Sequence, residues 1–358
     1  MNFKKTLDNY KNQLNNELSS LLVGKMEEAE NGFLKETYKN LKDYVLNGGK
    51  RLRPIALIMA YLAVNGKNAS RIISASASVE LLHNSTLIHD DVMDEDESRR
   101  DKATIHKKMR EWFLAKSPEV RYAGHLFDRT SSRFAVTNAV CDGNILFTLG
   151  LRSILDSGFG SDLIKEAAAV YSDAYKIVND GQIMDNQFEL ESGISEKEYL
   201  VMIEKKTANL FLASIQIGAI LGNANKEQYD ALSSFAKLVA GAFQLQDDIM
   251  SIDGSLKERH GSDIRKGKKT LLVIKAIESA NAKQKKLIED VLGKDDASTE
   301  DVNSVISVIE DVGAMDYVKN LALKRIEQGK TQLIKAKLKK EAEDFFIELA
   351  DYMAARKK

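Results

Sequence analysis

The sequence predicts an all-α fold, and three of its properties support this. Residues that favour helix, above all Ala, Leu, Lys, Glu and Ile, dominate the 358-residue chain. Only two prolines, Pro54 and Pro118, interrupt it. Apolar residues recur at helical spacing in most segments, and the strict alternation that is typical of strands is scarce. We therefore expect packed helices in a single domain over residues 1–358, long enough to bury a large core.

The boundaries of the expected helices can be read in order along the chain. One helix covers 39–50 and stops at the Gly48-Gly49 pair, and the next has Pro54 in its first turn, where proline is tolerated. A helix that starts at residue 195 opens with Ser195 and Glu198, which have the spacing of a capping box. The other expected helices cover 69–94, 161–190, 195–222, 227–253 and, as amphipathic helix, 270 to the end.

One stretch interrupts the helical pattern. Residues 115–133 mix proline, glycine, serine and charged residues, so we expect a loop there, as part of an insertion near 109–133. Low-complexity segments and repeats of fixed period are absent from the sequence. The insertion is thus expected to interrupt one domain without dividing it into two.

Composition excludes several classes of function. The chain has 52 basic and 53 acidic residues, and its net charge of -1 provides no overall attraction to nucleic acid or anionic membranes. A lone cysteine, Cys141, excludes an intramolecular disulfide and a cysteine-rich zinc site. The first residues are polar, and no apolar run approaches the ~20 residues of a membrane helix. We expect a cytoplasmic protein with no nucleic-acid partner and no stable membrane insertion.

The first candidate site is the acidic stretch LIHDDVMDEDESRR, which ends an apolar helix. Asp90 and Asp94 are four residues apart, so their carboxylates share one helix face about 5–6 Å apart. Such a pair repels itself unless a hard cation bridges it, and magnesium uses one or two protein carboxylates together with phosphate oxygens. A solvated helix end would explain this motif taken alone, so a second observation is needed.

That second observation is FQLQDDIMS at 243–251. Gln244, Asp247 and Asp248 fall on one face of an apolar helix, where unpaired charge is costly. Two carboxylate pairs on two largely apolar helices suggest the opposing walls of one cavity. Cations accompany them in four places, and together they are typical of two diphosphate pockets, one bridged by metal and one held by cations alone. These cations are Lys50, Arg51, Arg53, Arg99, Arg100, Lys205, Lys206, Lys266, Lys268 and Lys269.

At this point the chain resembles the trans-isoprenyl diphosphate synthases, the polyprenyl synthetase family, from about Asn47 to Tyr317. Six motifs occur in the family's order: GGKRLRP, LLHNSTLIHDDVMDEDESRR, GQIMD, KKTANLF, FQLQDD and GSDIRKGKKT. The resemblance implies an isoprenoid-synthase-like helical bundle around a deep central apolar cavity, in a homodimer. It also implies Mg²⁺-assisted ionisation of an allylic diphosphate, followed by head-to-tail condensation with isopentenyl diphosphate.

The resemblance also implies a role for each matching residue. Asp90, Asp94 and Asp247 would bind magnesium, as three ions with the bound diphosphate, and Asp91 and Asp248 would support them. Lys206 would act in catalysis with these aspartates. The contacts to the allylic diphosphate would be Arg99, Lys206, Thr207, Gln244 and Lys268. The pocket for isopentenyl diphosphate would be Lys50, Arg53, His83 and Arg100.

The chain departs from the family pattern in three places. Ser251 replaces a usual third aspartate of the second motif, for which we expect weakened rather than lost activity. A lysine usually shortly precedes the GSD glycine, and here Lys257 and Arg259 are equal candidates. The segment between His106 and Asp142 is longer than usual, and Cys141 stands where glycine is common.

The helix that carries Asp90 also predicts product length. Thr86 and Leu82 lie one and two turns below Asp90, at about 5.4 Å per turn, and Ser85 lies beside Thr86. Farnesyl-making relatives usually have an aromatic residue at the position of Ser85 or Thr86. The small residues here predict a product of C20, geranylgeranyl diphosphate, or longer, although they could equally serve close helix packing.

Two other functions compete with this one. A terpene cyclase shares the fold and an aspartate motif, but it has no use for the isopentenyl pocket that GGKRLRP indicates. A catalytically weak or silent subunit of a heteromeric synthase would typically lose an aspartate motif. Here the first motif is complete and the second lacks only its last acid, at Ser251.

Overall fold

A computed structural model describes residues 3–64, 66, 69–191, 193–253, 260–294, 296–334 and 336–354, and this part of the chain is almost entirely helical. The all-α prediction is confirmed. The helices are α1 Phe3–Glu27, α2 Gly32–Leu46, α3 Leu52–Val64, α4 Ala69–Met93, α5 Ile105–Leu114, α6 Thr130–Leu155, α7 Ser161–Leu190, α8 Glu196–Ile203, the π-helix η1 Glu204–Ala208, α9 Asn209–Leu221, α10 Lys226–Met250, α11 Ser262–Arg265, α12 Leu271–Ser279, α13 Ala282–Val291, α14 Thr299–Asp311, α15 Ala314–Ile334 and α16 Lys340–Ala354.

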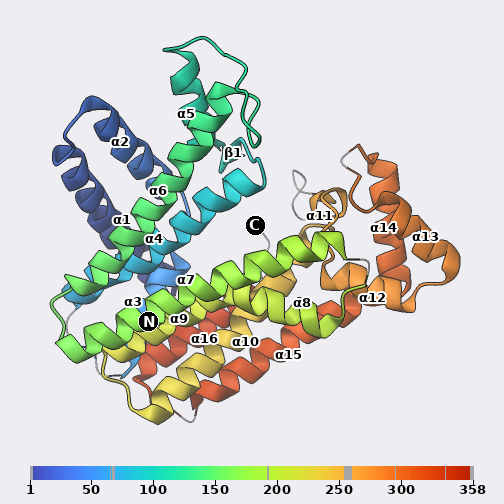
Figure 1. Ribbon diagram of the computed structural model, residues 1–358. Coiled ribbons are helices and arrows are strands. Elements are labelled where there is room, and N and C mark those ends of the chain that lie inside the picture. Colours follow the sequence, from blue (N-terminus) through green and yellow to red (C-terminus); the bar gives the residue numbers. More distant parts are fainter. Residues whose placement is uncertain are drawn as a thin grey trace.

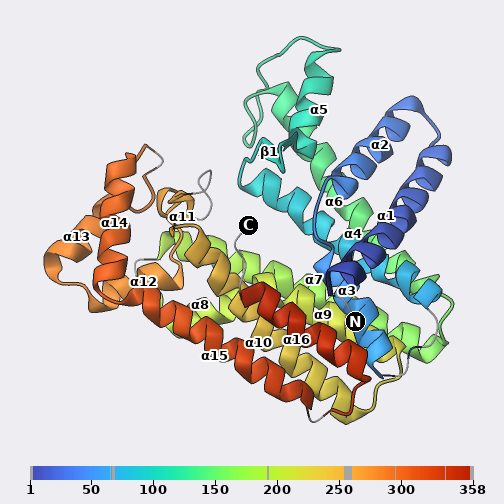
Figure 2. The same cartoon turned by 180° about the vertical axis from the view of Figure 1, so that it is seen from behind.

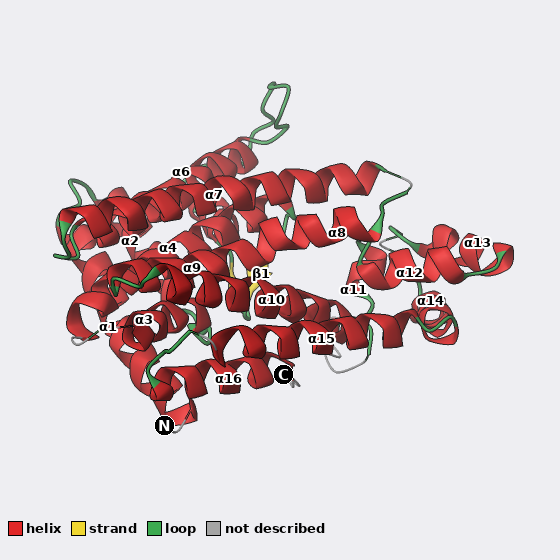
Figure 3. Ribbon diagram, turned by 90° about the horizontal axis from the view of Figure 1, so that it is seen from below, coloured by secondary structure: helices red, strands yellow, loops and turns green. Residues whose placement is uncertain are grey.

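The helices form three groups in space. A layer of long helices contains α7, α9, α10, α15 and α16 (Figure 3). The helices α1, α2 and α5, with the ends of α4 and α6, rise from one end of this layer, and α11 to α14 lie at its other end (Figures 1 and 2). The two chain ends meet at the layer, where Phe3 packs on Phe345 and Tyr352 at ring-centroid distances of 5.2 and 5.6 Å.

Local sequence explains most helix boundaries. Asn31 caps α2 through a hydrogen bond from the backbone of Leu34, so this helix begins earlier than residue 39. The predicted capping box of Ser195 and Glu198 is present at the start of α8, and Asn225 forms another at α10. Helix α7 has the predicted bounds. The segment predicted as one helix over 195–222 is instead divided into α8, η1 and α9.

Apolar burial joins the groups around α4. One core cluster packs α1, α2, α5 and α6 against one side of α4, through residues such as Leu81 and Ile88. Another packs α3, α7 and α9 against it through Val79 and Leu82. Because α4 is covered on several sides, even small polar side chains are buried along it, such as Ser76, Ser78 and Ser85. This arrangement places the acidic end of α4 beside the long-helix layer.

The predicted insertion is a loop with narrower bounds than expected. Residues 109–114 belong to α5 and 130–133 to α6, so the loop proper covers 115–129. It is ordered by its own contacts, since Ser131 and Thr130 donate hydrogen bonds to the carboxylate of Glu119. An antiparallel bridge also joins Arg121 to Arg129. The loop therefore extends α5 and α6 without forming a separate core.

Helix α6 is a longer apolar segment than the sequence led us to expect. Among the described residues, α6 is long and apolar enough to cross a membrane, judged by length and composition alone. A core helix of a soluble protein passes the same test, and α6 packs along α4. Gly143 and Gly150 are the contact points, because a Cβ on them would overlap the imidazole of His89 and the carbonyl oxygen of Ser78, both on α4.

Candidate active site

The first aspartate motif lies where α4 ends. Asp90 is half-buried in the last turn, and Asp94 is exposed just after it, with its backbone N–H bonded to the Asp90 carbonyl at 2.8 Å. Burial raises the pKa of Asp90 to about 6, the cation of Lys206 opposes this, and the neighbouring carboxylate of Asp94 adds to it. The end of α4 thus concentrates negative charge that needs a cation.

Asp91 belongs to the same motif but points into the protein. It is 1% exposed, accepts a hydrogen bond from Tyr44 of α2 at 2.7 Å, and pairs with Arg99 at 2.5 Å. A buried carboxylate with two donors is satisfied and fixed in place. Asp91 therefore anchors the helix end and leaves Asp90 and Asp94 available to a ligand.

A small hairpin presents the two arginines that follow the motif. Strands β1 (Ser98–Arg99) and β2 (Lys102–Ala103) pair antiparallel around Arg100 and Asp101, whose φ angles are +51° and +61°. Two left-handed residues are what a two-residue hairpin turn requires. Asn47 binds the carbonyl oxygens of Arg99 and Arg100 and accepts from the Arg100 guanidinium, which joins the hairpin to the turn after α2.

The second aspartate motif lies near the end of α10. Asp248 is 3% exposed and accepts hydrogen bonds from the hydroxyl of Tyr199 on α8 and the amide of Gln244. Burial raises its pKa to about 7, and these two donors oppose the shift. Ser251, the residue that departs from the family pattern, donates to the Asp248 carbonyl at 2.7 Å and ends the helix.

A π-helix positions the lysine of the KKTANLF motif. Such a segment adds a residue to a helical turn and is frequent at functional sites. Gly181 of α7 packs directly on η1, since a Cβ there would lie 2.3 Å from the backbone nitrogen of Lys206. One turn later Asp185 pairs with the ammonium of Lys206 at 2.5 Å. The GQIMD motif thus lets the backbones of α7 and η1 approach closely at Gly181, and its Asp185 orients the ammonium of Lys206.

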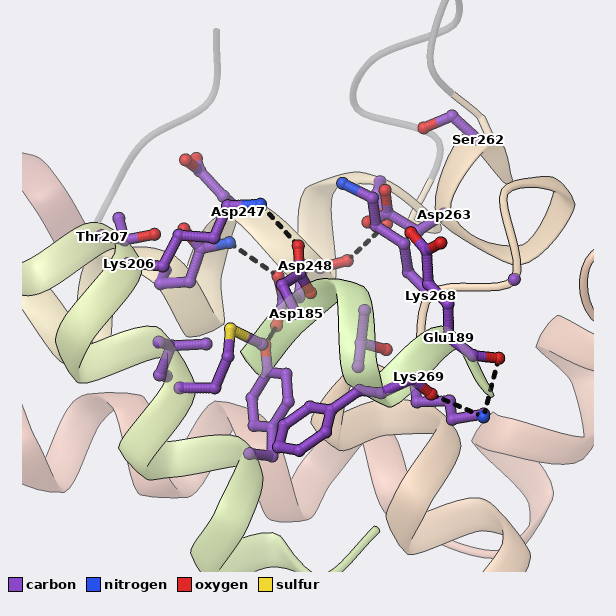
Figure 4. Close-up of a pocket in the computed structure, with 18 of the residues that line it drawn as sticks. Asp185, Glu189, Lys206, Thr207, Asp247, Asp248, Ser262, Asp263, Lys268 and Lys269 are labelled. Atoms are coloured by element: carbon purple, nitrogen blue, oxygen red, sulfur yellow. Dashed lines mark hydrogen bonds and ion pairs between the residues drawn. The ribbon is translucent and has the colours of Figure 1, made fainter. Parts of the chain in front are cut away.

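Helices α7, α8 and α10, the π-helix η1 and the segment from α11 to α12 surround a cavity of about 330 Å³, a size typical of ligand sites. The predicted metal ligands Asp90 and Asp94 are not among its lining residues. Figure 4 shows Lys206, Thr207 and Asp247 on one side, Asp263 and Lys268 on the other, and Asp185 and Asp248 between them. Six predicted residues line it, namely Lys206, Thr207, Gln244, Asp247, Asp248 and Lys268. Although burial alone would lower the pKa of Lys268, the carboxylates of Asp263, Asp185, Asp94 and Asp248 raise it.

The two aspartate motifs share these cations. Lys206 acts on Asp90, and Lys268 is influenced by Asp94 of the first motif and Asp248 of the second. An ion pair of 3.3 Å between Lys266 and Asp96 directly joins the loop after α11 to the loop after α4. Among the residues that the structure describes, no three His, Cys, Asp or Glu side chains form a ready-made metal cluster. The carboxylates therefore face a common charged space without forming a closed cage.

The residues predicted to form the cation-only pocket gather beside α4. The guanidinium of Arg53 is 3.4 Å from His83, and both are half-buried. Burial and the neighbouring Arg53 and Arg100 hold the pKa of His83 well below its usual range, so its imidazole is neutral. Lys50 lies over the ring of Tyr352 on α16, 5.0 Å from its centroid. Arg51, counted among the site cations in the sequence, instead points into the core.

The three residues predicted to control product length differ in their environments. Ser85 is fully buried and Leu82 is 1% exposed, whereas Thr86 is half-buried and bonds the carbonyl of His83. Leu82 packs in the apolar cluster with α3, α7 and α9. Apolar side chains therefore fill the space below Thr86, in the direction that the predicted tunnel would take.

Sequence reasoning missed the tyrosines of the site. Tyr44 and Tyr199 hold the second aspartate of each motif, yet they lie about 47 and 49 residues from their partners. No periodicity or spacing links residues so far apart. The candidate lysine equivalents Lys257 and Arg259 lie outside the described residues, as do the last four residues of the chain.

A family model and two similar known proteins agree on one family. The family model for polyprenyl synthetase matches residues 35–309. A geranylgeranyl diphosphate synthase of Methanosarcina mazei is 35% identical over 324 residues, which is 90% of each chain. A geranylgeranyl diphosphate synthase of Sulfolobus acidocaldarius is 33% identical over 88% of each chain.

Solved structures agree with this result. The geranylgeranyl pyrophosphate synthetase of Pyrococcus horikoshii superposes with a TM-score of 0.83 at 29% identity, covering 99% of this chain and 100% of that one. A geranylgeranyl pyrophosphate synthase of Corynebacterium glutamicum, solved with isoprenyl diphosphate and magnesium, has a TM-score of 0.86 at 24% identity and covers 99% of this chain and 100% of that one. At 24% identity, the similarity to the Corynebacterium glutamicum structure supports the fold only.

Proposed function

Because the chain belongs to the polyprenyl synthetase family, we propose that it is a trans-prenyltransferase, which condenses isopentenyl diphosphate head-to-tail with an allylic diphosphate to a product of C20 or longer. The observation that carries this assignment is the pair of aspartate motifs with shared cations. Lys266 pairs with Asp96, just after the first motif, at 3.3 Å. Lys268 lines the cavity together with Asp247 and Asp248 of the second motif. One diphosphate group could therefore contact both walls.

The residues at this site fit a divalent cation, which we propose is magnesium. The donors are carboxylate oxygens, the ligand type that magnesium prefers. The half-buried carboxylate of Asp90 carries a raised pKa beside Asp94, so a bound cation would relieve the repulsion between them. Asp90, Asp94 and Asp247 would hold magnesium, as three ions with the diphosphate. When bound, the metal neutralises charge on the departing diphosphate.

The chain's own residues would bind and orient the allylic diphosphate. Lys206 and Lys268 supply positive charge from opposite sides of the cavity, and the pair with Asp185 fixes the direction of Lys206. Thr207 and Gln244 offer hydrogen bonds on the same walls. Arg99 would approach from the hairpin. Cations aimed at charge that develops on a leaving group are an effective form of catalysis.

Isopentenyl diphosphate would occupy the neighbouring pocket. Arg53, Arg100 and Lys50 offer cationic donors there and the neutral imidazole of His83 offers one N–H donor, so this diphosphate needs no metal. Its double bond would attack the allylic carbon as the bond between that carbon and the allylic diphosphate breaks. The condensed chain would then lose a proton from the carbon next to its new cationic centre, and the released diphosphate would accept that proton. Apolar side chains of the α4 cluster would exclude water from the cationic carbon.

The environments around α4 sharpen the product-length proposal. Thr86 is half-buried one turn below Asp90, whereas Ser85 is enclosed by neighbouring side chains. We therefore expect Thr86→Phe to shorten the product more cleanly than Ser85→Phe. Thin-layer analysis of the dephosphorylated alcohols would show this, and an unchanged product distribution in both variants would remove α4 from control of length.

Two further expectations belong to the proposal. We propose a homodimer in the cytoplasm, as the resemblance to the family and the balanced charge favour. The competing proposal of a silent subunit rests on Ser251. Since Ser251 donates to the backbone and ends α10, it leaves Asp247 and Asp248 in place, which favours an active enzyme.

The decisive experiment uses the purified chain with Mg²⁺ and labelled isopentenyl diphosphate. Dimethylallyl, geranyl and farnesyl diphosphate are supplied separately, and products are resolved by chain length. We expect elongation from at least one primer to C20 or beyond, with none after metal chelation. Absence of product from every primer would contradict an active synthase, and a cyclised hydrocarbon made without isopentenyl diphosphate would support a cyclase.

A further inference from the structure

We propose that Arg51 and Glu80 form a buried positioning pair that holds the turn between α2 and α3 in the shape needed to bind isopentenyl diphosphate. This inference rests on the proposed function and adds two residues to its machinery. Neither would touch the substrate, because the side chains of Arg51 and Glu80 are 0% and 4% exposed. They would act through Lys50 and Arg53, which lie on either side of Arg51 in the sequence.

The guanidinium of Arg51 connects three helices. It pairs with Glu80 of α4 at 2.5 Å, donates to the carbonyl of Val45 in α2 at 2.6 Å, and donates to Asn15 of α1 at 3.0 Å. A planar guanidinium is suited to several partners in fixed directions, whereas a lysine ammonium is a single point charge. The turn is therefore attached to the protein core through one side chain.

The backbone of this turn needs such an attachment. Gly48, Gly49 and Arg51 have φ angles of +70°, +88° and +54°. The left-handed region is readily available to glycine but costs energy for arginine. Gly49 is also crowded, since a Cβ there would lie 3.3 Å from Nη1 of Arg51 and 3.4 Å from Nη1 of Arg100. The contacts of Arg51 hold it in a conformation that leaves Lys50 exposed and brings Arg53 beside His83.

Glu80 supplies the counter-charge for the whole pocket. Besides its ion pair with Arg51, its carboxylate raises the pKa values of Arg53 and Arg100, which burial lowers. Without this carboxylate, three guanidinium groups would gather with less to oppose their repulsion. Asn84 donates to the same carboxylate at 3.1 Å and fixes its orientation.

The pair also connects the pocket to the catalytic helix. Glu80 lies on α4, three residues before His83 and ten before Asp90. The ion pair thus fixes the turn that carries Lys50 and Arg53 to the same helix that carries the first aspartate motif. Loss of the pair would displace the isopentenyl pocket while the allylic site, built on α7, η1 and α10, stays in place.

The test compares the KM values of the two substrates. Arg51→Lys keeps the charge but loses the three-way contact, so we expect KM for isopentenyl diphosphate to rise about tenfold. Asn15→Ala removes one of the three contacts and should raise it a few-fold. KM for the allylic diphosphate should change by less than about twofold in both variants. The matched control is Arg152→Lys, in an exposed ion pair with Asp156 at 2.8 Å, which should change neither value.

Other outcomes would overturn the proposal. Equal increases in both KM values, or none, would show that Arg51 does not act on one pocket. Should Arg51→Lys fail to fold, Asn15→Ala decides the matter alone. Calorimetric binding of isopentenyl diphosphate needs no turnover, so it tests the pair even if the wild-type chain does not elongate. Equal affinity in the wild type and Asn15→Ala would then reject the inference.

Discussion

The two aspartate motifs share a buried second aspartate, but the partners of that aspartate differ. In each motif the second aspartate is buried and accepts a hydrogen bond from a tyrosine on another helix, Tyr44 for Asp91 and Tyr199 for Asp248. Asp91 also has a cationic partner, Arg99 at 2.5 Å. Asp248 has the neutral amide of Gln244 instead, and its pKa is raised to about 7.

Within each motif the buried second aspartate supports the structure, and the first aspartate is the one available to a ligand. A carboxylate that faces inward to a tyrosine fixes the rotation of its helix, so the preceding aspartate points away from that packed side. Both aspartate pairs lie in the last turn of their helices, α4 and α10. The buried aspartate of the first pair is balanced by a cation, whereas that of the second is balanced by neutral donors. We infer that the first motif tolerates rearrangement of its loop, while the second depends on close packing.

Removing the first aspartate of either motif should have the largest effect. We expect Asp90→Ala to lower kcat by about a thousandfold or more, and Asp247→Ala somewhat less, because Asp90 shares its face with Asp94. Steady-state turnover at saturating Mg²⁺ and substrates measures this. Asp156→Ala, on the exposed end of α6, is the control. Wild-type turnover in Asp90→Ala would contradict the assignment of the motif.

The tyrosines test the comparison through stability. Tyr199→Phe leaves a fully buried carboxylate with one neutral donor, so we expect a loss of about 2 kcal/mol in the free energy of unfolding. Tyr44→Phe should cost less, because Asp91 keeps its ion pair with Arg99. Urea unfolding of both variants checks the order. A larger loss in Tyr44→Phe would reverse our view of which motif depends on packing.

Asp142 is a third buried aspartate, and unlike Asp91 and Asp248 it has no tyrosine donor. It is 2% exposed, one of its oxygens has no hydrogen-bond partner, and burial raises its pKa to about 7. Folding therefore favours the protonated form, so wild-type stability should fall as pH rises from about 4 to 7. Asp142→Asn should remove this loss and stabilise the protein by about 1–2 kcal/mol at pH 8.

At pH 4 the same variant should differ little from the wild type, because the carboxyl group is then largely protonated in the folded state. Thermal unfolding at several pH values measures the difference. A pH-independent effect of Asp142→Asn would indicate lost packing and not lost charge.

The smallest effect is expected where the second motif departs from the family pattern. Ser251→Asp would restore a third acid one turn after Asp247, and we expect turnover at limiting Mg²⁺ to rise by a few-fold at most. Ser251→Ala serves as the control, since it removes the bond to the Asp248 carbonyl without adding charge. Lower activity in Ser251→Asp than in Ser251→Ala would show that the hydroxyl serves only to end α10.

The sequence alone determined the helices, the family and the residues that carry charge at the site. Periodicity and capping residues are local, so the bounds of α7 and the capping box of α8 could be predicted directly. The aspartate motifs could be recognised because i and i+4 spacing is itself a statement about one helix face.

Tertiary structure decided which of these charges face a ligand. Arg51 and Lys206 are both cations in recognised motifs, yet one is buried against Glu80 and the other lines the cavity. The tyrosine partners of Asp91 and Asp248 come from helices nearly fifty residues away, and the π-turn at Lys206 depends on contact with Gly181. Burial and pairing arise only when distant helices pack, so no local pattern in the chain encodes them.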